Sequence, residues 1–236
     1  GTGESEIGWA NIVVDVGDQA SVTIVIEYSG SARYAADTSV LVADGAHLSL
    51  VQVHEWDDGT LHDEHIGARL GRDASYRYSS VSLGGELVRV APTVRFEGPG
   101  SKAELLGVCF AGPGQHFESR LYVDHAAPSC TSDVLSKNAL LGDTARTVWV
   151  GDVRIRPEAP GTSSYEMNRN LLLSDGARAD SVPNLEIETG EIIGAGHASA
   201  TGRFDDLQLF YLQSRGIAHD EAQRLVVRGF FADVID

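Results

Sequence analysis

The sequence predicts a mainly β protein, a parallel β-solenoid that ends in a short helical pair. Three observations lead to this fold class. Short alternating or β-branched runs fill about the first 200 residues, turns of one composition recur at spacings near 30, and helical periodicity is confined to the end of the chain. We therefore expect a β-helix core over residues 1–203 and a helical segment over residues 204–236.

The strand prediction depends on runs rich in valine, isoleucine, leucine, threonine and tyrosine. Such residues suit a pleated surface that is buried on one face. The clearest runs are residues 20–26, 38–42, 47–53, 76–81, 103–110 and 147–150.

A recurring turn that combines glycine or aspartate with alanine precedes several of these strands. It occurs at residues 17–20, 44–46, 71–74, 142–145 and 175–177, and residues 98–103 form a degenerate copy. Glycine and aspartate allow a sharp bend, and alanine is small enough to lie inside the corner. Asp18, Asp44 and Asp73 are 26 and 29 positions apart, and Asp143 and Asp175 are 32 apart. Such spacings without intervening helices are typical of stacked β coils.

An antiparallel sandwich with glycine-rich turns is the alternative fold. It requires two-residue hairpin turns, which are sparse in this sequence. The clearest hairpin candidate is Asp58–Gly59, between Trp56 and Leu61, which we interpret as a local protrusion.

The end of the chain predicts two helices. Residues 205–216 begin with acidic residues and end at Gly216, which are start and stop signals of a helix. Asp220 and Glu221 mark the first turn of a second helix, where they complement the helix dipole. Its apolar stripe consists of Ala222, Leu225, Val226, Phe230 and Val234, with Phe231 beside it.

Charge and composition exclude several classes of partner. The chain has 18 Lys and Arg against 34 Asp and Glu, a net charge of −16, which argues against nucleic-acid and anionic-membrane surfaces. No apolar run approaches the roughly 20 residues of a membrane span.

Two cysteines build no disulfide framework, so we expect a cytoplasmic protein, with Cys109 in the core and Cys130 accessible. The start at Gly-Thr-Gly and the single Met167 indicate a piece of a longer chain.

The densest polar segment is residues 54–65, in which His62 and His65 are weak metal candidates. These two histidines are three positions apart in a segment that reads as turn or strand, so they point to opposite faces. We therefore favour a solvated loop. The sequence contains neither a phosphate-binding loop nor a nucleophile elbow, and we assign no catalytic residue.

His197 lies where the last predicted coil meets the helices. Small residues flank it within residues 194–200, which leaves the imidazole uncovered. An uncovered neutral imidazole can bind a metal or a partner, although a structural histidine is an equally good interpretation of the composition.

Residues 170–187, 196–206 and 208–217 closely resemble the carboxyl-terminal core of the SufB/SufD family of iron–sulfur cluster assembly proteins. The resemblance extends more loosely through residues 123–128, 136–138 and 150–152. It implies a right-handed parallel β-helix followed by helices, and a non-catalytic scaffold subunit.

Two positions resemble SufD-like rather than SufB-like members. SufB-like members carry a cysteine where this chain has Leu212, and commonly a glutamate where it has Ala198. His197 matches the histidine that SufD-like proteins bring to a shared interface, whereas Ala195 replaces a cysteine of many SufD-like sequences. The resemblance thus implies that His197 is a candidate ligand of a transient iron–sulfur cluster shared with a partner subunit. It implies no cofactor in the isolated chain and a flavin in the assembled complex.

The implied partners are a SufB-like subunit, or a second copy of this chain in isolation, and a SufC-type ATPase that docks on the helices. The candidate docking residues are Phe210, Tyr211, Arg215, Leu225, Val226, Phe230 and Phe231. We expect Phe210, Leu225 and Val226 to face the β body and the two later phenylalanines to face the partner. No nucleic acid or membrane partner is expected.

Two other functions remain open. A β-helix polysaccharide-active enzyme would use Asp57, Asp58, Asp63 and Glu64 in acid–base chemistry or calcium binding. A self-pairing β-helix interaction protein would have no ATPase partner.

Overall fold

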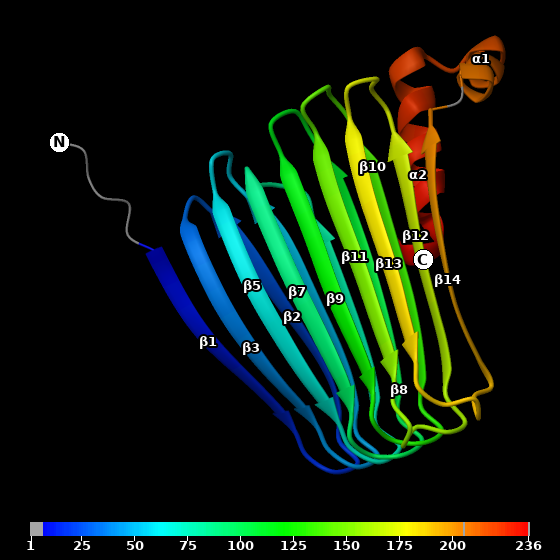
Figure 1. Ribbon diagram of the computed structural model, residues 1–236. Coiled ribbons are helices and arrows are strands. Elements are labelled where there is room, and N and C mark those ends of the chain that lie inside the picture. The colour runs from blue at the N-terminus through cyan, green and yellow to red at the C-terminus, as the bar shows by residue number, and fades with distance from the viewer. Residues whose placement is uncertain (1–6, 205, 236) are drawn as a thin grey trace.

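The computed structural model describes residues 7–204 and 206–235 and shows a parallel β-solenoid (Figure 1). Two seven-stranded sheets face each other, one with the order β1-β3-β5-β7-β9-β11-β13 and the other β14-β12-β10-β8-β6-β4-β2. The strands are β1 Ile7–Val16, β2 Ser21–Gly30, β3 Arg33–Val42, β4 His47–Trp56, β5 Leu61–Leu70, β6 Ser75–Ser82, β7 Leu87–Phe96, β8 Lys102–Ala111, β9 His116–His125, β10 Thr131–Leu140, β11 Arg146–Ile155, β12 Ser163–Leu172, β13 Arg178–Ile187 and β14 Gly194–Arg203. The predicted fold class is confirmed.

Successive strands alternate between the sheets, so each pair of strands forms one coil. The register shows the coil length directly. Ile7 pairs with Arg33, a step of 26 residues, and Arg146 pairs with Arg178, a step of 32 residues. Every strand pair is parallel, which a solenoid achieves without helical crossovers.

The core lies between the two sheets. Alternate residues of each strand point inward, as Val88, Val90, Val94 and Phe96 do on β7. Because neighbouring strands are in register, each inward position stacks on its counterpart in the next coil. The same face therefore repeats along the molecule, and inward polar residues stack on one another in places, as Asn138 and Asn170 do.

The corners confirm the role of the turn alanines. The N–H groups of Ala46, Ala74 and Ala145 donate to carbonyls three residues earlier, and these side chains are fully buried. The turns nevertheless lie at two different edges of the solenoid, whereas the sequence analysis counted them as one repeating series. Residues 17–20, 44–46, 71–74 and 98–103 follow odd-numbered strands, and residues 142–145 and 175–177 follow even-numbered strands at the other edge. Each coil has two corners, and either corner accepts the same turn chemistry.

Asp58–Gly59 is a coil corner, and the prediction of a hairpin protrusion there is wrong. It connects β4 to β5, which belong to different sheets and do not pair. Gly59 has a φ of 80°, the left-handed conformation that the bend requires.

The chain ends in two helices, α1 Asp206–Ser214 and α2 His219–Ile235. Helix α2 packs on the outer face of β8 and β10, where Phe231 contacts a cluster with Val108 and Ala139. The Lys137 ammonium group donates to the Phe230 carbonyl at 2.6 Å. In the described part of the chain, neither helix has the length and apolar character needed to cross a membrane.

Candidate functional site

His197 lies on β14, the last strand of its sheet, at the end of the solenoid farthest from β1 (Figure 1). Its register partner on β12 is Glu166, so both side chains project on the inner face of the sheet. Glu166 is buried, whereas the His197 side chain is exposed because no further coil follows β14 in the described chain. The terminal coil therefore presents an imidazole at its open end, next to a buried carboxyl group.

The Glu166 carboxyl group is under-satisfied. Neither of its oxygens has a hydrogen-bond partner among the described residues. Burial, with a smaller contribution from the charge of Asp152, raises the pKa of Glu166 to about 7. Gly151 of β11 leaves the space that this carboxyl occupies, because a Cβ there would lie 2.8 Å from Glu166 Oε1. Glu166 thus titrates in the range of neutral pH.

A ladder of hydrogen-bonded polar side chains runs along the inner face of the last coils. The Asn170 amide nitrogen, with two hydrogens to donate, lies 2.9 Å from Asn168 Oδ1 and 3.0 Å from both Ser181 Oγ and Thr201 Oγ1. In turn, Asn138 Nδ2 donates to Asn170 Oδ1 at 2.8 Å. The ladder connects the interior to the terminal strand that carries His197.

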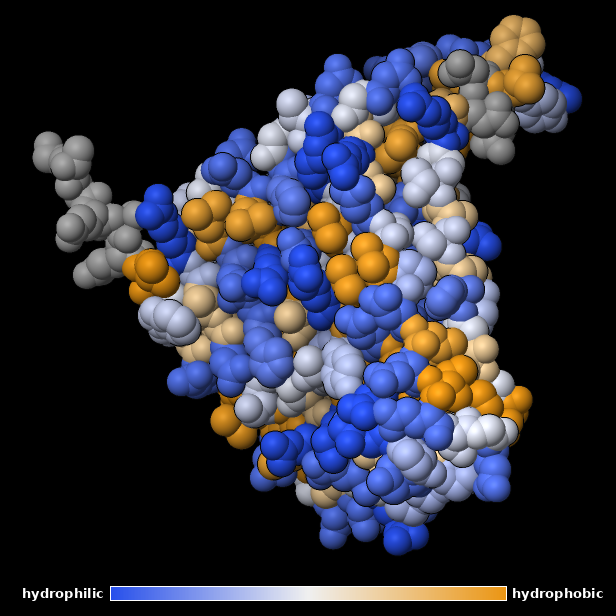
Figure 2. All heavy atoms as spheres, viewed as in Figure 1, coloured by the Kyte–Doolittle hydropathy of each residue, from blue (hydrophilic) through white to orange (hydrophobic). Residues whose placement is uncertain are grey.

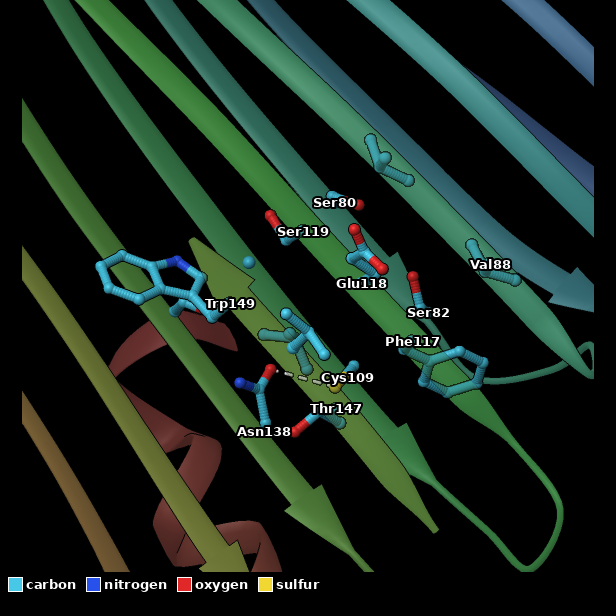
Figure 3. Close-up of a pocket in the computed structure, with 15 residues that line it drawn as sticks. Ser80, Ser82, Val88, Cys109, Phe117, Glu118, Ser119, Asn138, Thr147 and Trp149 are labelled. Atoms are coloured by element: carbon cyan, nitrogen blue, oxygen red, sulfur yellow. Dashed lines mark hydrogen bonds between the residues drawn. The ribbon is translucent and has the colours of Figure 1, made fainter. Parts of the chain in front are cut away.

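The ladder continues to a small internal cavity of about 40 Å³ (Figure 3). Cys109 donates its S–H group to Asn138 Oδ1 at 3.0 Å, and Thr147, Ser119 and Trp149 line the same space. A cavity of this size has room for about two waters. The solenoid interior is thus polar toward its carboxyl-terminal end.

Both cysteines are buried, which confirms the core position of Cys109 and contradicts the accessible position expected for Cys130. Burial raises the pKa of both thiols, so neither is a ready thiolate. Cys130 lies in the corner between β9 and β10, where the turn packs inward. Its polar neighbours in the sequence do not reveal this packing.

Except for Val226, the helical candidate residues face the opposite way from the expected one. Phe231 is buried against the β body and Phe230 is partly buried there. Phe210, Tyr211 and Leu225 are exposed, with Phe210 69% accessible. The expectation that the last two phenylalanines face a partner is therefore wrong for the described chain. Helix α2 turns its final apolar residues onto the sheet because β8 and β10 expose Val108 and Ala139 there.

Arg215 and Val226 complete the set of predicted docking residues. Arg215 is exposed and lies over the Tyr211 ring, at 5.0 Å from its centroid, while Val226 is partly buried.

The two weak metal candidates lie apart. His62 is buried inside the solenoid, and His65 is exposed on the outer face, where its Nδ1 lies 2.8 Å from Asp37 Oδ1. The spacing of the two histidines predicted that they point to opposite faces, and they do. The prediction that residues 54–65 form a solvated loop is wrong. Residues 54–65 comprise the end of β4, a corner and the start of β5, and His54, His62 and Glu64 are all fully buried.

The carboxylates of the proposed polysaccharide enzyme do not share a groove. Asp57, Asp58 and Asp63 are exposed, whereas Glu64 points into the interior. The described structure gives this alternative no common acid–base face.

Sequence reasoning missed Glu166, Asn168 and Asn170. The signal was present in β12, where Ser164 and these three residues alternate with Tyr165, Met167 and Arg169. Period-2 alternation shows that they share a face. Polar residues are ordinarily assigned to the outer face, and here the polar set is the inner one.

These features define a class of protein: a β-solenoid with an exposed histidine at an open terminal coil. The comparison with known families agrees with this class. Residues 1–230 match the family model described as SUF system FeS cluster assembly, SufBD core domain. The chain belongs to the SufBD family of iron–sulfur cluster assembly proteins.

Curated relatives support the same family. An iron–sulfur cluster assembly SufBD family protein of Mycobacterium tuberculosis is 55% identical over the whole chain, and one of Mycobacterium leprae is 54% identical. The chain spans about three fifths of these relatives, 61% and 62% of their length. A second SufBD family protein of M. leprae is 30% identical over 86% of the chain, which spans 23% of that protein. A second M. tuberculosis protein is 29% identical over the same share. Each organism thus has two different relatives of this chain.

Proposed function

We propose that this protein is a SufD-like scaffold subunit. It pairs its terminal coil with a SufB-like solenoid and docks a SufC-type ATPase on its helices. The observation that carries this proposal is the open end of the solenoid, where exposed His197 lies in register with Glu166, whose carboxyl group has no hydrogen-bond partner in the described part of the chain. The scaffold has no hydrolytic step of its own in this proposal, because the ATPase supplies it.

The end of the solenoid has the surface that a partner would cover. Strands β13 and β14 are the last strands of their sheets in the described chain, so their outer backbone groups are free to accept another strand. Val182, Ile187 and Ile193 are exposed here, and Figure 2 shows hydrophobic residues around the end of β13. The two SufBD relatives in one organism support pairing between unlike subunits.

One imidazole cannot hold a cluster, so most ligands come from the partner in this proposal. Cluster iron is usually held by thiolates, with histidine as a minority ligand. Both cysteines of this chain are buried away from the open end, which leaves His197 as its soft or borderline ligand at that surface. Glu166 lies behind it as a carboxyl group able to accept or release a proton near pH 7.

The exposed side of the helices supports ATPase docking. Phe210, Tyr211 and Leu225 remain uncovered, and hydrophobic residues are visible over α1 in Figure 2. Apolar residues on an unpartnered helix fit a groove of another protein. Phe230 and Phe231 have the different role of anchoring α2 to the sheet.

Co-purification tests the proposal. The full-length protein is co-expressed with the SufB-like and SufC-type proteins of its own organism, isolated through an affinity tag, and reconstituted anaerobically with iron and sulfide. We expect a complex of the three proteins whose visible spectrum shows cluster absorption, while the chain alone stays colourless. Flavin absorption in the same spectrum tests the implied flavin. A self-paired chain that retains neither partner would contradict the proposal and support the self-pairing alternative.

A further inference from the structure

A second cluster of ligand-type side chains lies inside the opposite half of the solenoid. His54 is on β4, and His62 and Glu64 are on β5, so the three residues meet across the corner that joins the two sheets. One donor atom from each side chain lies within 4.8 Å of the other two. All three side chains are fully buried.

The carboxylate of Glu64 is oriented by its neighbours. Oxygen Oε1 accepts hydrogen bonds from the Thr38 hydroxyl at 2.8 Å, the Gln52 amide at 2.9 Å and the Tyr28 hydroxyl at 3.2 Å. Gln52 is itself held by the Tyr78 hydroxyl at 2.7 Å. With Oε1 saturated, the other oxygen, Oε2, is directed toward the two imidazoles.

The imidazoles direct nitrogen atoms at that same oxygen. Nε2 of His62 lies 3.3 Å from Glu64 Oε2, and Nε2 of His54 lies 3.8 Å from it. His54 Nδ1 is 3.3 Å from the Val81 carbonyl oxygen, and as the donor there it leaves Nε2 with a free lone pair. That buried Nε2 has no hydrogen-bond partner among the described residues. In the neutral form of His54 this lone pair and the carboxylate oxygen face each other, which leaves a position between them that suits a cation.

We propose that His54, His62 and Glu64 form a binding site for one divalent transition-metal ion. Two imidazoles and one carboxylate are a common ligand set for Zn²⁺ and for non-haem Fe²⁺. Metal–ligand bonds of about 2.1 Å place two ligands of a tetrahedral ion about 3.4 Å apart. The separations of 3.3 and 3.8 Å from Glu64 Oε2 lie on either side of this value. Oxygen-preferring Mg²⁺ and Ca²⁺ do not suit the imidazoles.

The surroundings hold the ligands in place. Tyr28 stacks on the His54 ring with centroids 5.1 Å apart, and Tyr34 and Trp56 pack against His62 at 5.4 and 5.5 Å. Hydrogen bonds to the bound carboxylate and an apolar wall are the outer shell that metal sites ordinarily have. Burial lowers the pKa of His54. Burial by itself would raise the pKa of Glu64, but hydrogen bonds, including those from Thr38 and Gln52, hold this pKa below its usual range. Neutral imidazole and ionised carboxylate are the forms that bind metal.

This site is independent of the function proposed for the terminal coil. The metal ligands lie on β4 and β5, whereas His197 lies on β14. An ion bound here would join the two sheets at one corner.

Metal titration of the full-length protein tests the inference. The chelator-treated protein is titrated with Co²⁺ and, separately, unfolded in urea and refolded with Co²⁺ or Zn²⁺, because the site is buried. We expect one Co²⁺ per chain with visible ligand-field bands, no thiolate charge-transfer band, and competition by Zn²⁺. No binding by either route would overturn the proposal and leave a proton-sharing hydrogen-bond cluster.

Three variants locate the site. Glu64→Gln keeps the side-chain shape and is expected to weaken Co²⁺ binding by at least about 100-fold, and Gln52→Leu, which removes an outer-shell contact, by about 10- to 100-fold. His65→Gln is the matched control, since His65 is exposed one position away and should leave affinity unchanged. Circular dichroism of each variant shows whether it folds, and the wild-type result stands if one does not. Unchanged affinity in a folded Glu64→Gln protein, or lost binding in His65→Gln, would contradict the assignment.

Discussion

At the scale of single residues, two buried carboxyl groups of the solenoid have opposite surroundings. Glu64 is surrounded by donors, which favour its ionised form, whereas Glu166 has no donor among the residues that the structure describes and favours its neutral form. Both carboxylates are buried to the same degree. The difference arises from the neighbouring strands. Those around Glu64 supply donors, whereas Glu166 lies next to the terminal strand at the open end.

Substitution of Glu166 tests this contrast. Its folded pKa of about 7 is above the ordinary value of 4.5, so the folded state binds the proton more tightly than the unfolded state. The stabilisation from that proton is complete below about pH 4.5 and is lost as the pH rises through 7. At pH 8 the ionised group therefore costs up to roughly 3 kcal/mol. Glu166→Gln should be more stable than wild type at pH 8 and similar to it at pH 4.5, measured by urea unfolding.

The control for Glu166 is Glu158→Gln, which changes an exposed corner carboxylate. It should show no such pH-dependent difference. If Glu166→Gln behaves like this control, Glu166 is ionised without penalty in the folded protein.

Substitution of His197 tests the proposed ligand. His197→Ala in the full-length protein should abolish cluster assembly in a complementation assay. The fold should be retained, because the side chain is exposed on a terminal strand. His47→Ala removes an exposed imidazole from the same sheet far from the open end and should have no effect. Normal assembly by His197→Ala would remove His197 from the mechanism.

At the scale of elements, α2 depends on a few contacts with the outer face of the sheet. Phe231 packs on Val108 and Ala139, and Lys137 links the Phe230 carbonyl and ring to β10. The two sides of the helical segment therefore differ in role. Its inner side fixes the helix, and its exposed side carries Phe210, Tyr211 and Leu225, the side chains that we propose contact a partner.

Phe231→Ala should release α2 while the β body stays folded. Truncating a buried phenylalanine costs about 3–5 kcal/mol when the surrounding structure cannot adapt, and less when an element detaches instead. Limited proteolysis should then cut around residues 204–218 faster than in wild type, with unchanged hydrogen exchange in the strands. Phe210→Ala, at an exposed position on α1, is the control and should leave cleavage unchanged. Global loss of strand protection in Phe231→Ala would show that α2 is part of the cooperative core.

At the scale of the whole molecule, the solenoid is close to one-dimensional. Each coil contacts its two neighbours, so local damage is transmitted along the rod rather than across a shared centre. The corner alanines are buried within this stack. Their position along the rod should decide how far a defect spreads.

Overpacking two corners at different positions tests this property. Ala74→Leu, between β5 and β6, should destabilise the central coils by about 1–3 kcal/mol and reduce hydrogen-exchange protection on both sides. Ala177→Leu, between β12 and β13, should affect the last coils and leave β3 to β8 protected. Identical exchange patterns in the two variants would show that the solenoid unfolds as one unit.

The fold was predictable because its signals are local and repeat. Strand runs, corner alanines and the two helices each follow from composition and periodicity. The candidate site was predictable in one residue, His197, through a resemblance, while Glu166 and the asparagine ladder were missed. His54 and Glu64 were assigned to a solvated loop because their polarity outweighed the strand pattern. Whether a strand places its polar residues outward or inward depends on the facing sheet, which the local pattern does not specify.

The sequence by itself determined that the chain is a coiled β structure with helices at its end, since side-chain period and turn chemistry are properties of neighbouring residues. The tertiary structure alone decided which residues share a surface. His54, His62 and Glu64 converge because a corner folds β5 back against β4, and Glu166 lies beside His197 because a step of 31 residues completes one coil. Strand register and the stacking of the two sheets bring these residues together, and both arise from packing between coils.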